Sequence, residues 1–211
     1  MISDGMAEVL RSLRLGEVGD PARACAQALR AEGVVLSLPA GPDPTAEPVW
    51  CHSELSARFE ELQFTLGEGP GPDAVRSGSP VVEPDLGRVR AGRWPALLPA
   101  ARELGVHGVC CFPLVIGAIR VGTLTMLSEG DRRLSRQQYT DATALTSVPT
   151  SGFLDGGTRG FPGSACPWSW RRGRGRLRHR GHPGTGTGSE RGPARLTAVT
   201  SPAPPSRCRC R

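Results

Sequence analysis

The longest apolar stretch of this chain, residues 106–127, places the strongest constraint on its fold. It reads VHGVCCFPLVIGAIRVGTLTML and predicts two β-strands joined by a turn at residues 116–118. In the first strand both alternating sets of side chains are largely apolar, which indicates a central strand covered on both faces. The remainder of the folded region must therefore supply helices to two faces of one sheet.

Helical and extended patterns alternate on both sides of this hairpin. Asp20 followed by Pro21 predicts a helix start, and Gly33 is expected to end that helix. Further helices are expected at residues 4–15, from Ser53, at 93–104 and from Leu134, and strands at 34–38, 49–52 and 79–86. This order predicts an α/β (α+β) fold with a central antiparallel sheet and helices on its faces.

The last third of the chain has a different composition. Residues 1–147 carry a net charge of −4, whereas residues 148–211 carry +10. The second segment is rich in Gly, Arg, Pro and Ser, and it shows no sustained helical or strand period. Such a segment buries too little apolar surface to offset the entropy lost on ordering it. We therefore expect a folded domain at 4–147 and a disordered Arg/Gly/Pro-rich tail at 148–211.

Two interpretations of this tail stay open. Clustered arginines next to Trp168 and Trp170 are typical of a segment that binds nucleic acid through phosphate contacts and stacking. These arginines are Arg171, Arg172, Arg174, Arg176, Arg178 and Arg180. The chain also lacks Lys and Asn, which indicates a GC-rich gene, and an out-of-frame reading of such a gene would give this composition. On that interpretation the tail is a frameshift product.

Several other function classes receive no support. The cysteines are odd in number and have no disulfide spacing, and neither a secretory signal nor a membrane-length apolar run is present, so we expect a cytoplasmic protein. Cys110 and Cys111 point to opposite faces of a strand and are expected to pack in the core. His52 and His107 have no catalytic partner at a recognisable spacing. We predict no enzyme activity, no metal site and no identifiable cofactor.

Four aromatic residues are candidates for lining a ligand pocket, because such pockets are largely apolar. They are Trp50, Phe59, Phe64 and Trp94. The Gly-Pro loop at residues 66–70 lacks the Gly-Lys-Ser/Thr ending of a phosphate loop, and Glu68 would repel phosphate. We interpret this loop as a tight turn at the pocket rim.

The segment FEELQFTLGEGPGPDA at 59–74 resembles the actinobacterial GAF domains that precede an ANTAR RNA-binding domain. PVVEPDL at 80–86, Arg93-Trp94-Pro95 and the hairpin with Phe-Pro-Leu at 112–114 extend the resemblance over residues 4–147. It implies a domain that senses a small molecule or a redox signal in a transcription antitermination regulator. The chain departs from the family twice, since Gly71 stands where many relatives have Cys and no ANTAR-like helical pattern follows Val148.

The resemblance leads to the prediction of a non-enzymatic sensory domain whose output domain has been lost. One alternative is a protein that associates with nucleic acid through its Arg-rich tail. The other is a bare dimerisation module, in which the helices at 4–15 and 134–147 pair between two copies. The sequence identifies no ligand.

Overall fold

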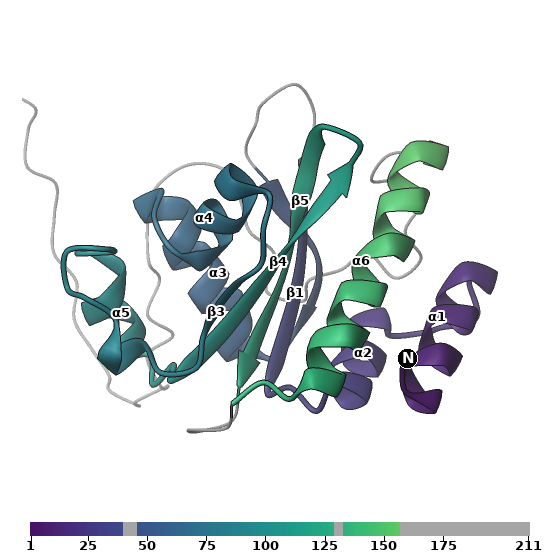
Figure 1. Cartoon of the computed structure of the whole chain (residues 1–211), viewed down its shortest axis with the longest axis horizontal. Helices are drawn as coiled ribbons and strands as arrows, with labels where there is room; N and C mark the ends of the chain where they lie inside the picture. Colours follow the sequence, from purple (N-terminus) through teal and green to yellow (C-terminus); the bar gives the residue numbers. More distant parts are fainter. Residues whose placement is uncertain (40–45, 129–132, 157–211) are drawn as a thin grey trace, which may run out of the picture. The chain divides into compact units, whose positions relative to one another are not determined.

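A five-stranded sheet forms the centre of the computed structural model, which describes residues 1–39, 46–128 and 133–156 (Figure 1). Its strand order is β2-β1-β5-β4-β3, and all neighbouring strands are antiparallel. The strands are β1 (Gly33–Pro39), β2 (Ala46–His52), β3 (Val81–Glu83), β4 (Gly108–Ile116) and β5 (Ile119–Ser128). The predicted hairpin supplies β4 and β5, which lie in the interior of the sheet.

Helices cover both faces of this sheet, as Figure 1 shows. On one face lie α1 (Asp4–Leu15), α2 (Pro21–Leu29) and α6 (Arg136–Gly156). On the other lie α3 (Glu54–Leu66), α4 (Pro70–Ser77) and α5 (Leu97–Glu103), with a short 3₁₀ turn, η1 (Leu86–Arg88), before α5. The predicted fold class, an α+β sandwich around an antiparallel sheet, is confirmed.

Local sequence signals place most helix starts correctly. The Asp20 side chain accepts a hydrogen bond from Arg23 N, and Pro21 is the first residue of α2. Ser53 caps α3 in the same way. The expected end of α2 at Gly33 was wrong, because Arg30 adopts the left-handed conformation at φ 50° and Gly33 already lies in β1.

Proline shortens two of the predicted elements. The strand expected over residues 79–86 is only Val81–Glu83, because Pro80 and Pro84 flank it and proline donates no hydrogen bond to a sheet. The helix expected from residue 93 begins at Leu97. This later start places Pro99 in the first turn of α5, where its missing N–H has no intrahelical partner to lose.

The two sides of the sheet bury separate apolar clusters. Against α1, α2 and α6 the strands pack apolar side chains, including Leu36, Phe112 and Leu124. The opposite face packs Val109, Cys111 and Leu127 against α3, α4 and α5. β5 also approaches β1 very closely at Gly122, where an added Cβ would lie 2.0 Å from the Ser37 carbonyl oxygen.

The last described helix continues beyond the expected domain end. We expected the folded domain to close at residue 147, whereas α6 extends to Gly156. Within the described ranges, no helix is both long enough and apolar enough to cross a membrane.

Candidate functional site

A buried carboxyl group lies between the sheet and α3. The Glu60 side chain accepts hydrogen bonds from Ser37 Oγ at 2.7 Å, Gln63 Nε2 at 2.9 Å and Thr125 Oγ1 at 3.1 Å. All three donors are neutral, and among the residues that the structure describes no arginine forms an ion pair with Glu60. We refer to Glu60, Gln63, Ser37, Thr125 and Cys111 as the Glu60 cluster.

Three adjacent strands of the sheet contribute side chains to this cluster. Ser37 of β1, Thr125 of β5 and Cys111 of β4 alternate with residues of the apolar face, so their side chains point toward α3. Cys111 Sγ lies 3.5 Å from Thr125 Oγ1. Since the Thr125 hydroxyl donates to Glu60, the Cys111 thiol donates to Thr125. A short chain of hydrogen bonds therefore crosses the sheet toward the carboxyl group.

Gln63 connects this cluster to α4. Its Nε2 donates to Glu60, while its Oε1 accepts a hydrogen bond of 2.7 Å from the Gly71 backbone N–H. Gln63 is 2% exposed and Glu60 is 9% exposed. A change in the charge or position of Glu60 would therefore act on the first turn of α4 as well as on the sheet.

Burial determines the protonation chemistry of the Glu60 cluster. It raises the pKa of the Glu60 carboxyl, and the three hydrogen bonds from Ser37, Thr125 and Gln63 offset only part of this effect. Burial also raises the pKa of the Cys111 thiol well above its ordinary value, and the nearby Glu60 carboxyl adds to the shift. A carboxyl group with no cationic neighbour, in a core of this kind, is a candidate functional group.

The glycine-proline loop next to this cluster holds three helices together. Gly67 ends α3 at φ 65°, Pro70 begins α4, and Glu68 Oε1 accepts hydrogen bonds from Ala96 N (2.7 Å) and Leu97 N (2.8 Å) at the start of α5. The loop is a turn, as predicted, but Glu68 caps a helix that lies far along the sequence.

Asp73 makes a second link between the same parts of the chain. Trp94 Nε1 donates to Asp73 Oδ2 at 3.1 Å, and Arg93 lies 3.5 Å from the same carboxylate oxygen. Arg93 also pairs with Glu83 and lies 4.3 Å from the centre of the Trp94 ring. The motifs at 66–73 and 93–94, which are distant in sequence, thus form one set of contacts in space.

The arrangement of sheet and helices is similar to that of several solved structures. One is the GAF domain of a phosphoenolpyruvate-protein phosphotransferase from Coxiella burnetii, with 16% identity and a TM-score of 0.56, and the match covers 75% of this chain and 99% of that one. The described chain has a GAF fold. The sequence itself matches no protein-family model and no curated protein.

Two further structures show that proteins of different kinds share the GAF fold. The chromophore-binding domain of a bacteriophytochrome from R. palustris has 12% identity and a TM-score of 0.52, with 72% of this chain and 60% of that chain covered. The free methionine-R-sulfoxide reductase of Neisseria meningitidis has 13% identity and a TM-score of 0.52, with 74% and 89% covered. The GAF fold alone therefore does not separate a sensor from an enzyme.

The four aromatic residues predicted to line a pocket lie in different places within this GAF fold. Trp50 belongs to the cluster beneath α1, α2 and α6, whereas Phe59 and Trp94 belong to the cluster on the opposite face. Phe64 is 40% exposed on α3. The sheet separates Trp50 from the others, so the four do not surround one cavity.

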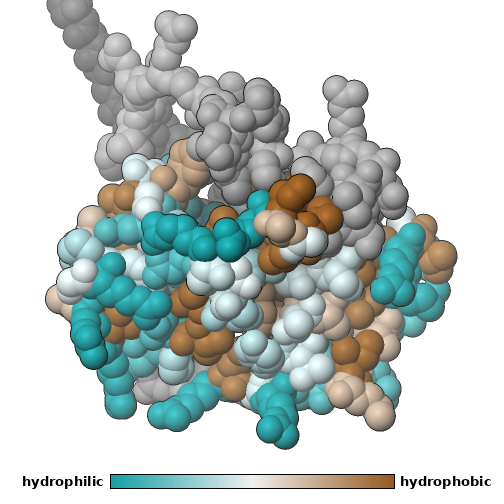
Figure 2. Space-filling view, turned by 45° about the horizontal axis from the view of Figure 1, so that its top comes forward, coloured by the Kyte–Doolittle hydropathy of each residue, from teal (hydrophilic) through white to brown (hydrophobic). Residues whose placement is uncertain are grey.

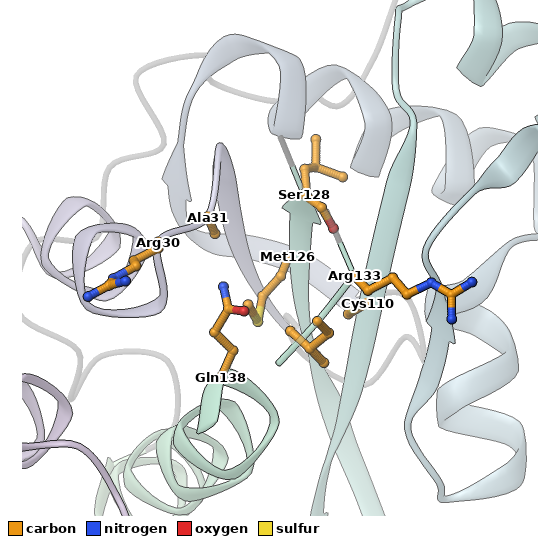
Figure 3. A pocket seen from close by; sticks show the side chains of 9 residues that line it. Arg30, Ala31, Cys110, Met126, Ser128, Arg133 and Gln138 are labelled. Atoms are coloured by element: carbon orange, nitrogen blue, oxygen red, sulfur yellow. The ribbon is translucent and has the colours of Figure 1, made fainter. Parts of the chain in front are cut away.

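A small hollow opens on the α2–α6 side of the sheet (Figure 3). It has a volume of about 20 Å³, which is room for about one water molecule. Gln138 points into it toward Met126 and Cys110, while the guanidinium groups of Arg30 and Arg133 point outward at opposite ends. The two arginines therefore do not form a joint anion site.

A larger hollow of about 310 Å³ adjoins it at the junction of α1, α2 and α6. Most of its polar groups are already paired. Asp141 accepts hydrogen bonds from Ser3 N at 2.8 Å and Ser3 Oγ at 2.7 Å, and Gln138 donates to the Leu29 carbonyl oxygen at 2.8 Å. These bonds connect the first residues of the chain to α6, which favours a structural role.

The thiols of Cys25, Cys110 and Cys111 are buried and free, and Cys51 is buried as well. Burial raises the pKa of both Cys25 and Cys110 to about 12, with the Asp20 and Glu83 carboxylates adding to the respective shifts. These thiols are therefore protonated at neutral pH, which agrees with the predicted core packing of Cys110 and Cys111. Across the described ranges no three His, Cys, Asp or Glu side chains gather as metal ligands.

Residues 148–156 of the predicted tail belong to α6, and the part beyond Gly156 lies outside the described residues. Neither its arginines from Arg171 to Arg180 nor the expected disorder of 148–211 is tested beyond the end of α6.

The Glu60 cluster was missed by the sequence analysis. Its signal was present as Ser56, Phe59, Glu60 and Gln63, which repeat at helical spacing.

Proposed function

We propose that this chain is a non-enzymatic, small-molecule-sensing GAF domain of a transcription antitermination regulator, of the kind that precedes an ANTAR domain in actinobacteria. The GAF fold and the contact network formed by residues 66–73 and 93–94 support this proposal. We place the folded sensory domain at 4–147 and its sensing site at the Glu60 cluster.

The observation that carries the proposal is the buried Glu60 carboxyl group, held only by neutral donors. A buried carboxyl without a cation costs free energy relative to an apolar residue of similar size. A protein is expected to keep such a destabilising group where the group has a functional role. Glu60 contacts β1, β5 and, through Gln63, α4. A ligand that changes the charge or position of Glu60 would therefore alter the packing of α3 and α4 on the sheet.

The state of the cysteines favours a small-molecule signal over a redox signal. Both thiol catalysis and thiol redox sensing need an accessible thiolate, and the buried thiols of Cys25, Cys110 and Cys111 have raised pKa values. The glycine at position 71 removes the thiol that many relatives carry there.

A thermal-shift screen of metabolites with the full chain tests the sensing site. A bound compound stabilises the fold by about 2.7 kcal/mol at a hundred times its dissociation constant. We expect compounds that raise the unfolding midpoint of the wild type to lose most of this effect in Glu60→Gln and to keep it in Glu61→Gln, an exposed neighbour on α3. Equal stabilisation of the wild type and Glu60→Gln would exclude the Glu60 cluster as the binding site.

The bare dimerisation module remains a second proposal, and the structure changes how it should be tested. The apolar side chains of α1, Met6, Leu10 and Leu13, are buried against the chain's own core, so deleting this helix would unfold the domain. Leu15 and Tyr139 remain 58% and 40% exposed. If the terminal helices pair between copies, Leu15→Glu with Tyr139→Glu should convert the dimer to a monomer in sedimentation experiments.

The remaining alternative is association with nucleic acid through the tail. Binding of RNA by the full chain, with a base preference that persists at high salt, would favour it. Replacement of Arg171, Arg172, Arg174, Arg176, Arg178 and Arg180 by Gln should then abolish that preference. RNA binding that weakens with salt equally for all RNA sequences would indicate charge attraction alone. The sensory function would then remain the favoured proposal.

A further inference from the structure

We infer that the segment joining β3 to α5 forms a second binding site, for a phosphate-bearing small molecule. An open hollow of about 740 Å³ lies on this segment. Its lining consists of Glu83, Arg88, Val89, Arg90, Gly92 and Arg93. The volume is within the range of small-molecule sites, about 300–1,000 Å³.

The charge of this hollow contrasts with that of the domain around it. Residues 1–147 carry a net charge of −4, yet the lining of the hollow has three arginines and one carboxylate. A concave surface lined mainly by one sign of charge concentrates ions of the opposite sign. Figure 2 shows several hydrophilic side chains that project at the left, which is the side on which α5 lies in Figure 1.

The three arginines are held to different degrees. Arg93 is fixed, because it pairs with Glu83 and Asp73 and lies against the Trp94 ring. Arg88 pairs at 3.0 Å with Asp85, but its side chain is 83% exposed and this surface ion pair is weak. Arg90 forms no ion pair with any residue that the structure describes. Arg88 and Arg90 are therefore available to an incoming anion.

The backbone holds these side chains on one short, turned segment. Arg88 N donates to Asp85 O at 3.1 Å and Arg93 N donates to Arg90 O at 2.9 Å, so two successive turns carry the arginines. The planar guanidinium group binds phosphate oxygens through two parallel hydrogen bonds. Arg93 is neutralised by Glu83 and Asp73, so Arg90 and the weakly paired Arg88 would supply the donors for one phosphate group.

This site is separate from the Glu60 cluster, so either proposal can fail without the other. It is connected to the sensory domain through Arg93, which contacts Asp73 of α4 and the Trp94 ring of the segment leading into α5. Occupation of the hollow would draw Arg88 and Arg90 toward the bound phosphate and would leave the core unchanged.

The test is a titration of the full, isotope-labelled chain with inorganic pyrophosphate at constant ionic strength. The backbone amide signals of Gly87 and Gly92 report the hollow separately from arginines elsewhere in the chain. We expect these two signals to shift and saturate. Absence of any shift up to about 10 mM pyrophosphate, a concentration that would detect binding with a dissociation constant of about 1 mM, would overturn the proposal.

Matched variants locate the binding. Arg88→Gln with Arg90→Gln should weaken binding by about 100-fold, since one charge-assisted hydrogen-bonding side chain contributes roughly tenfold. Arg23→Gln with Arg102→Gln removes two exposed arginines outside the hollow and should leave the titration unchanged. The same saturation curve for both double variants would overturn the proposal. A parallel titration with ADP identifies the source: affinity equal to that of pyrophosphate indicates the phosphate groups alone, and tighter binding indicates a nucleotide.

Discussion

The two faces of the sheet differ in what their strands bury. Toward α1, α2 and α6 the strands bury mainly apolar side chains, such as Leu36, Phe112 and Leu124. Toward α3 and α4 the same strands present Ser37, Cys111 and Thr125 around Glu60. An apolar face needs only complementary shape, whereas a polar one needs every donor and acceptor matched. The second face is therefore the one on which we propose that a ligand acts.

The largest loss of stability should come from removing a large side chain from the apolar face. Phe112 is 1% exposed and contacts the Tyr139 ring edge-on at 5.3 Å. Phe112→Ala should lower the free energy of unfolding by about 3–5 kcal/mol in urea titrations. Ile119→Ala is the matched control in the same hairpin, because Ile119 is 65% exposed and should change stability by less than about 0.5 kcal/mol. Similar losses in both variants would contradict the assignment of this face as the main apolar core.

The polar face should respond to pH through Glu60. Burial raises the pKa of this carboxyl in the folded chain, so its contribution to stability is complete below the ordinary carboxyl pKa and is lost as the pH rises through the raised value. Glu60→Gln removes this dependence. Its amide oxygen can accept from Gln63 and Thr125, while its amide N–H donates to Ser37.

Urea unfolding over a series of pH values measures this difference. We expect Glu60→Gln to match the wild type in acid and to become the more stable protein as the pH rises. Glu61→Gln, the exposed control, should follow the wild type throughout. A constant offset between Glu60→Gln and the wild type at every pH would show that the Glu60 carboxyl does not titrate as inferred.

A smaller effect is expected where the loop of the polar face caps α5. Glu68→Ala removes the acceptor for Ala96 N and Leu97 N and should cost about 0.5–2 kcal/mol, as for other lost helix caps. Glu68→Gln keeps one acceptor oxygen and should cost less. Amide exchange in α5 should accelerate in Glu68→Ala in proportion to the loss. Unchanged exchange there would show that the cap does not hold this helix.

The smallest effect concerns position 71, where the chain differs from the family to which we propose that it belongs. A Cβ at Gly71 would lie 3.1 Å from Gln63 Oε1, at the flexible end of that side chain. Gly71→Cys should therefore change stability by no more than about 1 kcal/mol, because slight overpacking is offset by reduced freedom of the unfolded chain. Gly122→Ala is the contrasting variant, since its Cβ would meet the Ser37 backbone at 2.0 Å, and it should destabilise the fold clearly more than Gly71→Cys does. A comparable loss in Gly71→Cys would mean that Gln63 cannot move.

Local features of the sequence determined most of the secondary structure. Asp20 with Pro21 and Ser53 mark helix starts, and the run at 106–127 marks the hairpin, because caps and apolar periodicity act over a few residues. The motif at 66–70 was also interpreted correctly as a turn. These signals, with the alternation of elements, were sufficient for the fold class.

Only the tertiary structure decided which residues meet. Glu68 caps a helix 28 residues away and Thr125 reaches Glu60 across 65 residues of sequence, and no periodic pattern encodes such pairs. The sequence grouped Trp50 with Phe59 and Trp94 because all are aromatic, yet the sheet separates them. Glu60 and Gln63 stand at buried positions of α3, which apolar residues usually occupy. Their burial depends on hydrogen-bond partners from other elements. Those partners come together only when the whole chain folds.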